Sequence, residues 1–157
     1  MAIFLRPIDQ SNYGDVLQLS VAPDQERFVA SNLQSLAEAY VWRDAAEPHA
    51  VYADDELVGF ALLYPLTEGP PAYPLPVDAT LRGYIIVRLM IDARFQGRGY
   101  GREALAAIVE IVRKRGLATI RLSVLPDNDQ AIEFYRRNGF AATGENEGDE
   151  IVMERAI

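Results

Sequence analysis

Three glycines fall within six residues in the stretch Gln96-Gly97-Arg98-Gly99-Tyr100-Gly101. The strongly apolar run before it, residues 84–91, indicates a strand buried on both faces. Apolar residues at helical spacing after it predict a helix over residues 99–115. Glycine lets a backbone approach a ligand closely, and free N–H groups at a helix start attract phosphate. This glycine-rich turn therefore predicts an anion site, which three arginines flank: Arg94, Arg98 and Arg102.

Two familiar nucleotide-binding loops do not match the turn. A Walker loop requires Gly-Lys-Ser/Thr, whereas Gly101 is followed by Arg102-Glu103. A Rossmann fingerprint that begins at Gly97 requires a small residue at position 102 and an acid at the end of the next strand. The segment 120–125 offers no acid. The turn belongs to neither class.

Working outward from the turn, hydrophobic periodicity and turn residues predict the remaining elements. Ser11 is a candidate cap for the first helix, and five prolines make residues 65–80 irregular. Gly139 is expected to end the last helix in a left-handed conformation, with Phe140 packing back on it. The predicted strands span 3–6, 49–53, 57–64, 84–91, 119–124, 141–144 and 151–155, and the predicted helices 12–19, 24–40, 99–115 and 127–138.

The order β-α-α-β-β-β-α-β-α-β-β predicts an α/β (α+β) protein with a mixed sheet. The 157 residues suit a single domain, 1–157. A formal charge of −8 argues against nucleic-acid binding and favours cationic small molecules. No apolar run is long enough to span a bilayer, so we expect no membrane partner. With no export signal, the cytoplasm is the expected location.

The residue inventory excludes several chemistries. The chain has no cysteine, which rules out a thiolate zinc site and a cysteine nucleophile. A single histidine and scattered carboxylates predict no metal site.

Two motifs carry a family resemblance. The run from Arg88 to Gly101 closely resembles motif A of GNAT acetyltransferases, Gln/Arg-x-x-Gly-x-Gly/Ala. Asn128, Ala131, Tyr135 and Gly139-Phe140 resemble the superfamily pattern Asn-x-x-Ala-x-x-x-Tyr-x-x-x-Gly-Phe. The resemblance implies a mostly antiparallel sheet flanked by helices, and an N-acetyltransferase that uses acetyl-CoA as co-substrate without a metal. Because the chain has no cysteine to form an acyl intermediate, we expect the amine to attack directly in a ternary complex.

Segments 28–32, 35–39, 58–60 and 88–92 look like the polyamine (spermine/spermidine) acetyltransferase subgroup, although Val87 stands where that subgroup usually has an acid. A small primary amine, first of all a polyamine, is therefore the expected acceptor. A peptide, amino-acid or antibiotic amine stays open, as does a non-catalytic acyl-CoA sensor. Because family members often dimerise through C-terminal strands, a homodimer also stays open.

The resemblance also implies how acetyl-CoA is held. The pyrophosphate would bind N–H groups from Gly97 to Gly101, and the pantetheine arm would run along Leu89-Met90-Ile91. The backbone N–H of Ile91 would polarise the thioester oxygen. The implied cofactor-binding residues are Leu89, Met90, Ile91, Gln96, Gly97, Arg98, Gly99, Tyr100, Gly101, Arg102, Asn128, Ala131 and Tyr135.

Tyr135 is the candidate general acid. It shares one helix face with Asn128 and Ala131 and lies roughly 10 Å along the axis from Asn128. Because a free phenol has a pKa of about 10, it is protonated at neutral pH and can donate to the thiolate. The alternative role is a core aromatic whose hydroxyl merely finds a partner.

The general base is left open. Glu26, Glu38 and Asp92 are the candidates, and Glu26, Glu38 and Arg88 are the expected substrate-side residues. His49 precedes an apolar strand and is interpreted as structural. The acidic run 145–150 is interpreted as a solvated turn, with attraction of an amine as the alternative.

Overall fold

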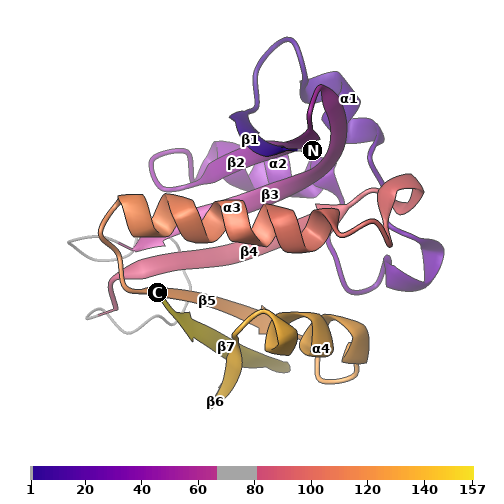
Figure 1. The fold of residues 1–157 in the computed structure, drawn as a ribbon. Helices are drawn as coiled ribbons and strands as arrows, with labels where there is room; N and C mark the ends of the chain where they lie inside the picture. The colour runs from indigo at the N-terminus through magenta and orange to yellow at the C-terminus, as the bar shows by residue number, and fades with distance from the viewer. Residues whose placement is uncertain (1, 67–80) are drawn as a thin grey trace.

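The computed structural model describes residues 2–66 and 81–157, and over these it forms a seven-stranded sheet in the order β1-β2-β3-β4-β5-β7-β6 (Figure 1). Every neighbouring pair is antiparallel except β4 and β5, which are parallel. The predicted order of strands and α-helices is confirmed. The strands are β1 (Ile3–Pro7), β2 (Glu47–Ala53), β3 (Glu56–Leu66), β4 (Gly83–Ile91), β5 (Thr119–Val124), β6 (Ala141–Glu147) and β7 (Glu150–Ala156).

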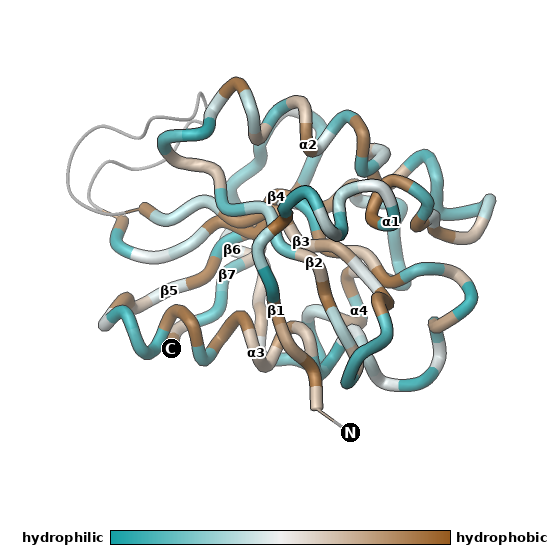
Figure 2. Tube along the Cα trace, turned by 90° about the horizontal axis from the view of Figure 1, so that it is seen from above, coloured by the Kyte–Doolittle hydropathy of each residue, from teal (hydrophilic) through white to brown (hydrophobic). Residues whose placement is uncertain are grey.

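Helices cover both faces of the sheet. Figure 2 shows α1 and α2 on one side of the strands and α3 and α4 on the other. Each side has its own apolar core, and the predicted stripe on α3 is buried against β1 and β4. No helix of the described residues is long and apolar enough to cross a membrane. The helices are α1 (Tyr13–Gln18), η1 (Pro23–Gln25), α2 (Asn32–Val41), η2 (Ala93–Phe95), α3 (Tyr100–Lys114) and α4 (Asp129–Arg137).

The central strands β4 and β5 are paired at one end only. Their register covers three residue pairs, from Gly83 with Thr119 to Ile85 with Arg121. At Gly83 the strands are so close that a Cβ atom would lie 2.1 Å from the Thr119 carbonyl oxygen. Beyond Ile85 the strands separate, and Figure 1 shows the gap widening toward α4. A wedge therefore opens at the carboxyl ends of β4 and β5.

A bulge in β4 lies beside this wedge. Leu62 pairs with Arg88 and Leu63 with Ile86, so Val87 has no partner in β3. Because a bulge adds one residue to the strand, the side chains after it point to the opposite face of the sheet from the one that regular alternation would give. Arg88 consequently reaches Glu38 on α2, and Leu89 packs with the core on the α3 side.

The second predicted helix is much shorter than expected. Pro23 starts a single 3-10 turn, and the α-helix begins only at Asn32. Ser31 caps it, since its hydroxyl accepts from the Gln34 N–H at 3.2 Å. The expected cap of the first helix was also wrong, because the hydroxyl of Ser11 donates to Asp9 instead.

Several segment ends also differ from the prediction. The acidic run 145–150 is not one solvated turn, because β6 continues to Glu147 and β7 starts at Glu150. Pro65 and Leu66 belong to β3, and the rest of the expected irregular segment, 67–80, lies outside the described residues. At Gly139 the prediction is confirmed, with a φ of 89° and a bond from the Phe140 N–H to the Tyr135 carbonyl.

Candidate active site

The glycine-rich turn forms an open N-terminus for α3. Gly97 and Gly99 have φ values of 77° and 85°, and a Cβ atom on either would meet nothing within 4 Å. The first backbone bond of the helix joins the Glu103 N–H to the Gly99 carbonyl, so the preceding N–H groups have no acceptor within the helix. Arg102 on the first turn is exposed and close to this end. These features fit a phosphate-bearing ligand.

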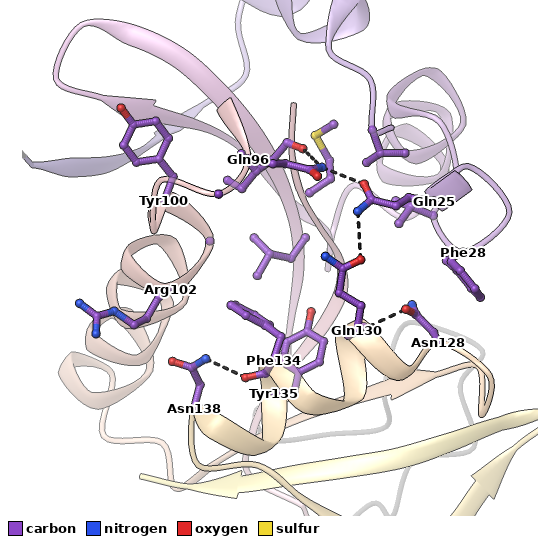
Figure 3. Close-up of a pocket in the computed structure, with 18 of the residues that line it drawn as sticks. Gln25, Phe28, Gln96, Tyr100, Arg102, Asn128, Gln130, Phe134, Tyr135 and Asn138 are labelled. Atoms are coloured by element: carbon purple, nitrogen blue, oxygen red, sulfur yellow. Dashed lines mark hydrogen bonds between the residues drawn. The ribbon is translucent and has the colours of Figure 1, made fainter. Parts of the chain in front are cut away.

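Three glutamine side chains connect the elements around the turn (Figure 3). The amide of Gln96 donates to the Ile91 carbonyl at 2.9 Å and to Gln25 at 2.8 Å. Gln25 in turn donates to Gln130 on α4 at 3.4 Å. A salt bridge of 2.8 Å between Arg27 and Asp127 runs alongside. These bonds connect the glycine-rich turn to β4, and they connect η1 to the start of α4.

A cavity of about 610 Å³ lies between β4, the start of α3 and α4. A cavity of this size can hold a small-molecule ligand. Of the predicted cofactor residues, all but Arg98 line it: Leu89, Met90, Ile91, Gln96, Gly97, Gly99, Tyr100, Gly101, Arg102, Asn128, Ala131 and Tyr135. Sequence reasoning missed further lining residues: Val21, Gln25, Phe28, Val29, Phe95, Gln130, Phe134, Arg137 and Asn138.

The free edge of β4 presents backbone groups to this cavity. The Asp92 N–H donates to the Val58 carbonyl at 2.9 Å, toward β3. Because N–H groups alternate along an antiparallel strand, those of Leu89 and Ile91 face away from β3, toward the wedge. The Ile91 carbonyl, which accepts from Gln96, has the same orientation. Within residues 2–66 and 81–157, one wall of the wedge therefore carries backbone N–H groups that no neighbouring strand pairs with.

Tyr135 projects from α4 toward this wall (Figure 3). Its ring is 9% exposed and packs edge-on against Phe134 and Phe140, with centroid distances of 5.1 and 5.4 Å. Among the described residues its hydroxyl has no hydrogen-bond partner. Burial raises the pKa of Tyr135 to about 12. The phenol is therefore protonated at neutral pH.

A smaller cavity of about 180 Å³ continues from the first into the wedge between β4 and β5. Its lining includes the polar residues Arg88, Ser123, Glu147 and Glu150. The last three were not predicted as site residues, although the acidic run had been noted. The two cavities share six lining residues: Phe28, Val29, Leu89, Asn128, Ala131 and Tyr135.

Asn128 serves first as a helix cap. Its side-chain oxygen accepts from the Ala131 N–H at 3.3 Å, which fixes the start of α4. Both residues line both cavities. The Asn128 amide NH₂ remains the group that could donate to a ligand.

The remaining candidates occupy other places. Glu26 is exposed and lines neither cavity. Glu38 forms a 3.4 Å salt bridge with Arg88, and its carboxylate is absent from both linings. His49 lies on β2, away from both cavities, with its Nδ1 3.0 Å from the Glu47 carbonyl oxygen. Burial lowers the pKa of this imidazole.

Asp92 has a structural role at the end of β4. It is 2% exposed, and its carboxylate accepts from the Ser20 N–H, the Arg94 N–H and the Arg94 Nε at 2.8–3.0 Å. Burial alone would raise its pKa, but these bonds outweigh burial and lower it. Such a carboxylate is a poor base. In residues 2–66 and 81–157, no group of three metal-ligating acids or histidines occurs.

Comparison with known proteins agrees with this geometry. The model of the acetyltransferase (GNAT) family matches residues 13–140. The spermine/spermidine N(1)-acetyltransferase of Bacillus subtilis is 29% identical over 150 residues, which cover 92% of this chain and 91% of that protein. The N-alpha-acetyltransferase RimI of Mycobacterium tuberculosis is 31% identical over 65% of this chain and 59% of its own.

Solved structures share the fold. An acetyltransferase from Thermus thermophilus superimposes with a TM-score of 0.75 at 20% identity, covering 100% of this chain and 98% of its own. The PaiA N-acetyltransferase of Thermoplasma acidophilum, in complex with coenzyme A, gives 0.68 at 19% identity over the full length of both chains.

The chain belongs to the acetyltransferase (GNAT) family. It is an N-acetyltransferase, and acetyl-CoA is its co-substrate.

Proposed function

We propose that this enzyme acetylates a primary amine of a polyamine by direct attack in a ternary complex, with Tyr135 as the general acid. The observation that carries the proposal is the position of Tyr135, which lines both cavities where they join. An acyl donor in the larger cavity and an amine in the smaller one would meet beside its hydroxyl. Acetyl-CoA supplies the activated acetyl group as a thioester.

The protein's own groups would divide the work as follows. N–H groups at the start of α3 and in the glycine-rich turn hold the pyrophosphate, with Arg102 beside them. The N–H groups of Leu89 and Ile91 face the wedge, so either can donate to the thioester oxygen; we assign Ile91 as the principal donor. Tyr135 protonates the departing sulfur. Its raised pKa keeps the proton available at neutral pH.

A polyamine is the acceptor that the surroundings favour. The chain carries a formal charge of −8, and the smaller cavity ends at two carboxylates. Negative potential concentrates cationic substrates near a site. The similarity to the spermine/spermidine acetyltransferase of B. subtilis points the same way.

The test is release of the CoA thiol from acetyl-CoA, with a panel of polyamines, amino acids, aminoglycosides and peptides. Tyr135→Phe should lower kcat with spermidine by about 10²-fold or more and leave the Kd for acetyl-CoA unchanged. Tyr84→Phe is the matched control. It removes a buried hydroxyl that bonds Glu47 at 3.0 Å, outside both cavities, so kcat should stay at the wild-type value. Equal kcat for both variants would exclude Tyr135 as the acid.

A further inference from the structure

The far wall of the smaller cavity is built by β5, β6 and β7. Glu147 and Glu150 pair directly across the β6–β7 hairpin, so their side chains project from the same face of the sheet. Ser123 on β5 pairs with Val152, two residues from Glu150, and its hydroxyl donates to Glu150 at 2.6 Å. All three residues line the cavity that shares Tyr135 with the acyl-donor side.

The two carboxylates have no cationic partner within the described residues. Arg121, which lies on the same face of β5 as Ser123, bonds Glu145 at 2.8 Å and Glu154 at 2.5 Å instead. Arg88, across the cavity on β4, is paired with Glu38. Like charges directly opposite each other on neighbouring strands destabilise a sheet, so this pair has a cost that a bound cation would remove.

The surroundings of Glu147 raise the pKa of its carboxyl group. The side chain is half-buried at the cavity wall. Burial raises the pKa of its carboxyl, the neighbouring Glu150 carboxylate raises it further, and the Ser123 hydroxyl offsets part of this rise. An acid with a raised pKa is a more effective base near neutral pH.

We propose that Glu147 is the general base of this enzyme and accepts a proton from the ammonium group of the incoming amine, while Glu150, held by the Ser123 hydroxyl, supplies a countercharge. This inference rests on the proposed function, since it assumes that the amine enters through the smaller cavity. It predicts an acceptor that is cationic and has no carboxylate beside the amine. An α-amino acid would place its own carboxylate against this acidic wall.

The protons and bonds of the reaction balance. The ammonium transfers one proton to Glu147, which releases it to solvent. The neutral amine nitrogen forms a bond to the acetyl carbon, and the carbon–sulfur bond breaks as Tyr135 donates its proton to the sulfur. The acetylated nitrogen then loses its second proton through water, which restores the Tyr135 phenol. The products are an amide, the free CoA thiol and one proton.

The experiment compares Glu147→Gln with Glu145→Gln in the full chain. Glu145 is exposed on the same hairpin and lies outside both cavities, so its variant controls for loss of one charge. With acetyl-CoA and spermidine, Glu147→Gln should lower kcat about 10²-fold or more and flatten the acidic limb of the pH–rate profile. Glu145→Gln should keep the wild-type kcat and profile.

A weakly basic amine provides the readout that a purely structural role would not change. Trifluoroethylamine is already neutral at pH 7, so it needs no base, and Glu147→Gln should use it with nearly the wild-type kcat. Equal losses with spermidine and trifluoroethylamine would overturn the role as base. If wild type acetylates spermidine and Glu147→Gln matches Glu145→Gln, this inference fails while the proposed function stands. If wild type leaves every polyamine unmodified, the proposed acceptor fails, and the inference with it.

Discussion

Gly59 on β3 lies so close to β4 that a Cβ atom at this position would be 2.4 Å from the carbonyl oxygen of Met90. The same Cβ would be 2.9 Å from the side chain of Ile91. Only glycine allows this approach, which sets how deeply β4 lies where its free edge borders the larger cavity. Gly59 therefore affects the site through the position of β4, although it lines neither cavity itself.

Gly59→Ala should consequently affect both stability and catalysis. Overpacking against a backbone carbonyl costs typically 1–3 kcal/mol, because β4 must move. We expect a loss of that size in the free energy of unfolding, measured with urea, together with a higher KM for acetyl-CoA. Gly14→Ala is the control, since a Cβ there meets nothing within 4 Å inside α1, and it should leave KM unchanged. An unchanged KM in Gly59→Ala would mean that β4 does not position the donor.

The glycine-rich turn gives a second prediction. Gly99→Ala places a side chain on a residue with a φ of 85°, which costs about 1–2 kcal/mol, and puts a methyl group at the proposed pyrophosphate site. Gly116→Ala imposes similar strain at a φ of 69°, just beyond the end of α3 and outside both cavities.

Both glycine variants should therefore lose a similar amount of folding stability, but only Gly99→Ala should weaken the binding of acetyl-CoA. Calorimetric titration of acetyl-CoA into the two folded variants separates the effects. We expect the Kd of Gly99→Ala to rise by at least tenfold and that of Gly116→Ala to match wild type. Equal Kd values would argue against close approach of the ligand to this turn.

The parts of this site that sequence predicts are those set by residues close together in the chain. The α3 stripe, the glycine-rich turn and the face of α4 that carries Tyr135 are local patterns, and periodicity alone predicts them. Gly139 was predictable for the same reason. The shortened α2 was missed because Ser31 and earlier polar residues are all acceptable caps, and only packing selects among them.

The missed half of the site depends on register between distant segments. Val87 lacks a partner because β3 and β4 slip by one residue, and no residue type marks that bulge. Glu147 reaches the cavity only because β7 inserts between β5 and β6, which sets Glu150 beside Ser123. A run of acids carries no information about such pairing. Gln25 was likewise hidden within a stretch expected to be helical.

The ion pair between Arg88 and Glu38 gives a third prediction. It joins β4 to α2 at 3.4 Å, and the Arg88 Nε and one Glu38 oxygen are buried without a hydrogen-bond partner among the described residues. Arg88→Met leaves the Glu38 carboxylate uncompensated and should cost roughly 1–3 kcal/mol. Adding Glu38→Gln to the Arg88→Met variant should restore at least half of the lost free energy of unfolding, because it removes the uncompensated charge. Urea unfolding of the four proteins in a double-mutant cycle measures the coupling.

Arg136→Ala is the control for this pair. It removes a partner of Glu133 on the exposed face of α4, and exposed pairs contribute at most about 1 kcal/mol. A coupling energy between Arg88 and Glu38 near zero would show that the pair does not hold α2 against β4.

The raised pKa of Tyr135 predicts how stability changes in alkaline solution. The unfolded chain ionises this phenol near pH 10, whereas the folded protein retains the proton to about pH 12. Between these values the unfolded state loses the proton first, so the folded state loses relative stability as pH rises. At pH 11 the contribution is about 1.4 kcal/mol, because one pKa unit corresponds to that free energy. Tyr135→Phe lacks the group. Urea unfolding from pH 8 to pH 11 should therefore show wild type losing about 1.4 kcal/mol more than the variant, and parallel curves would contradict a buried, protonated Tyr135.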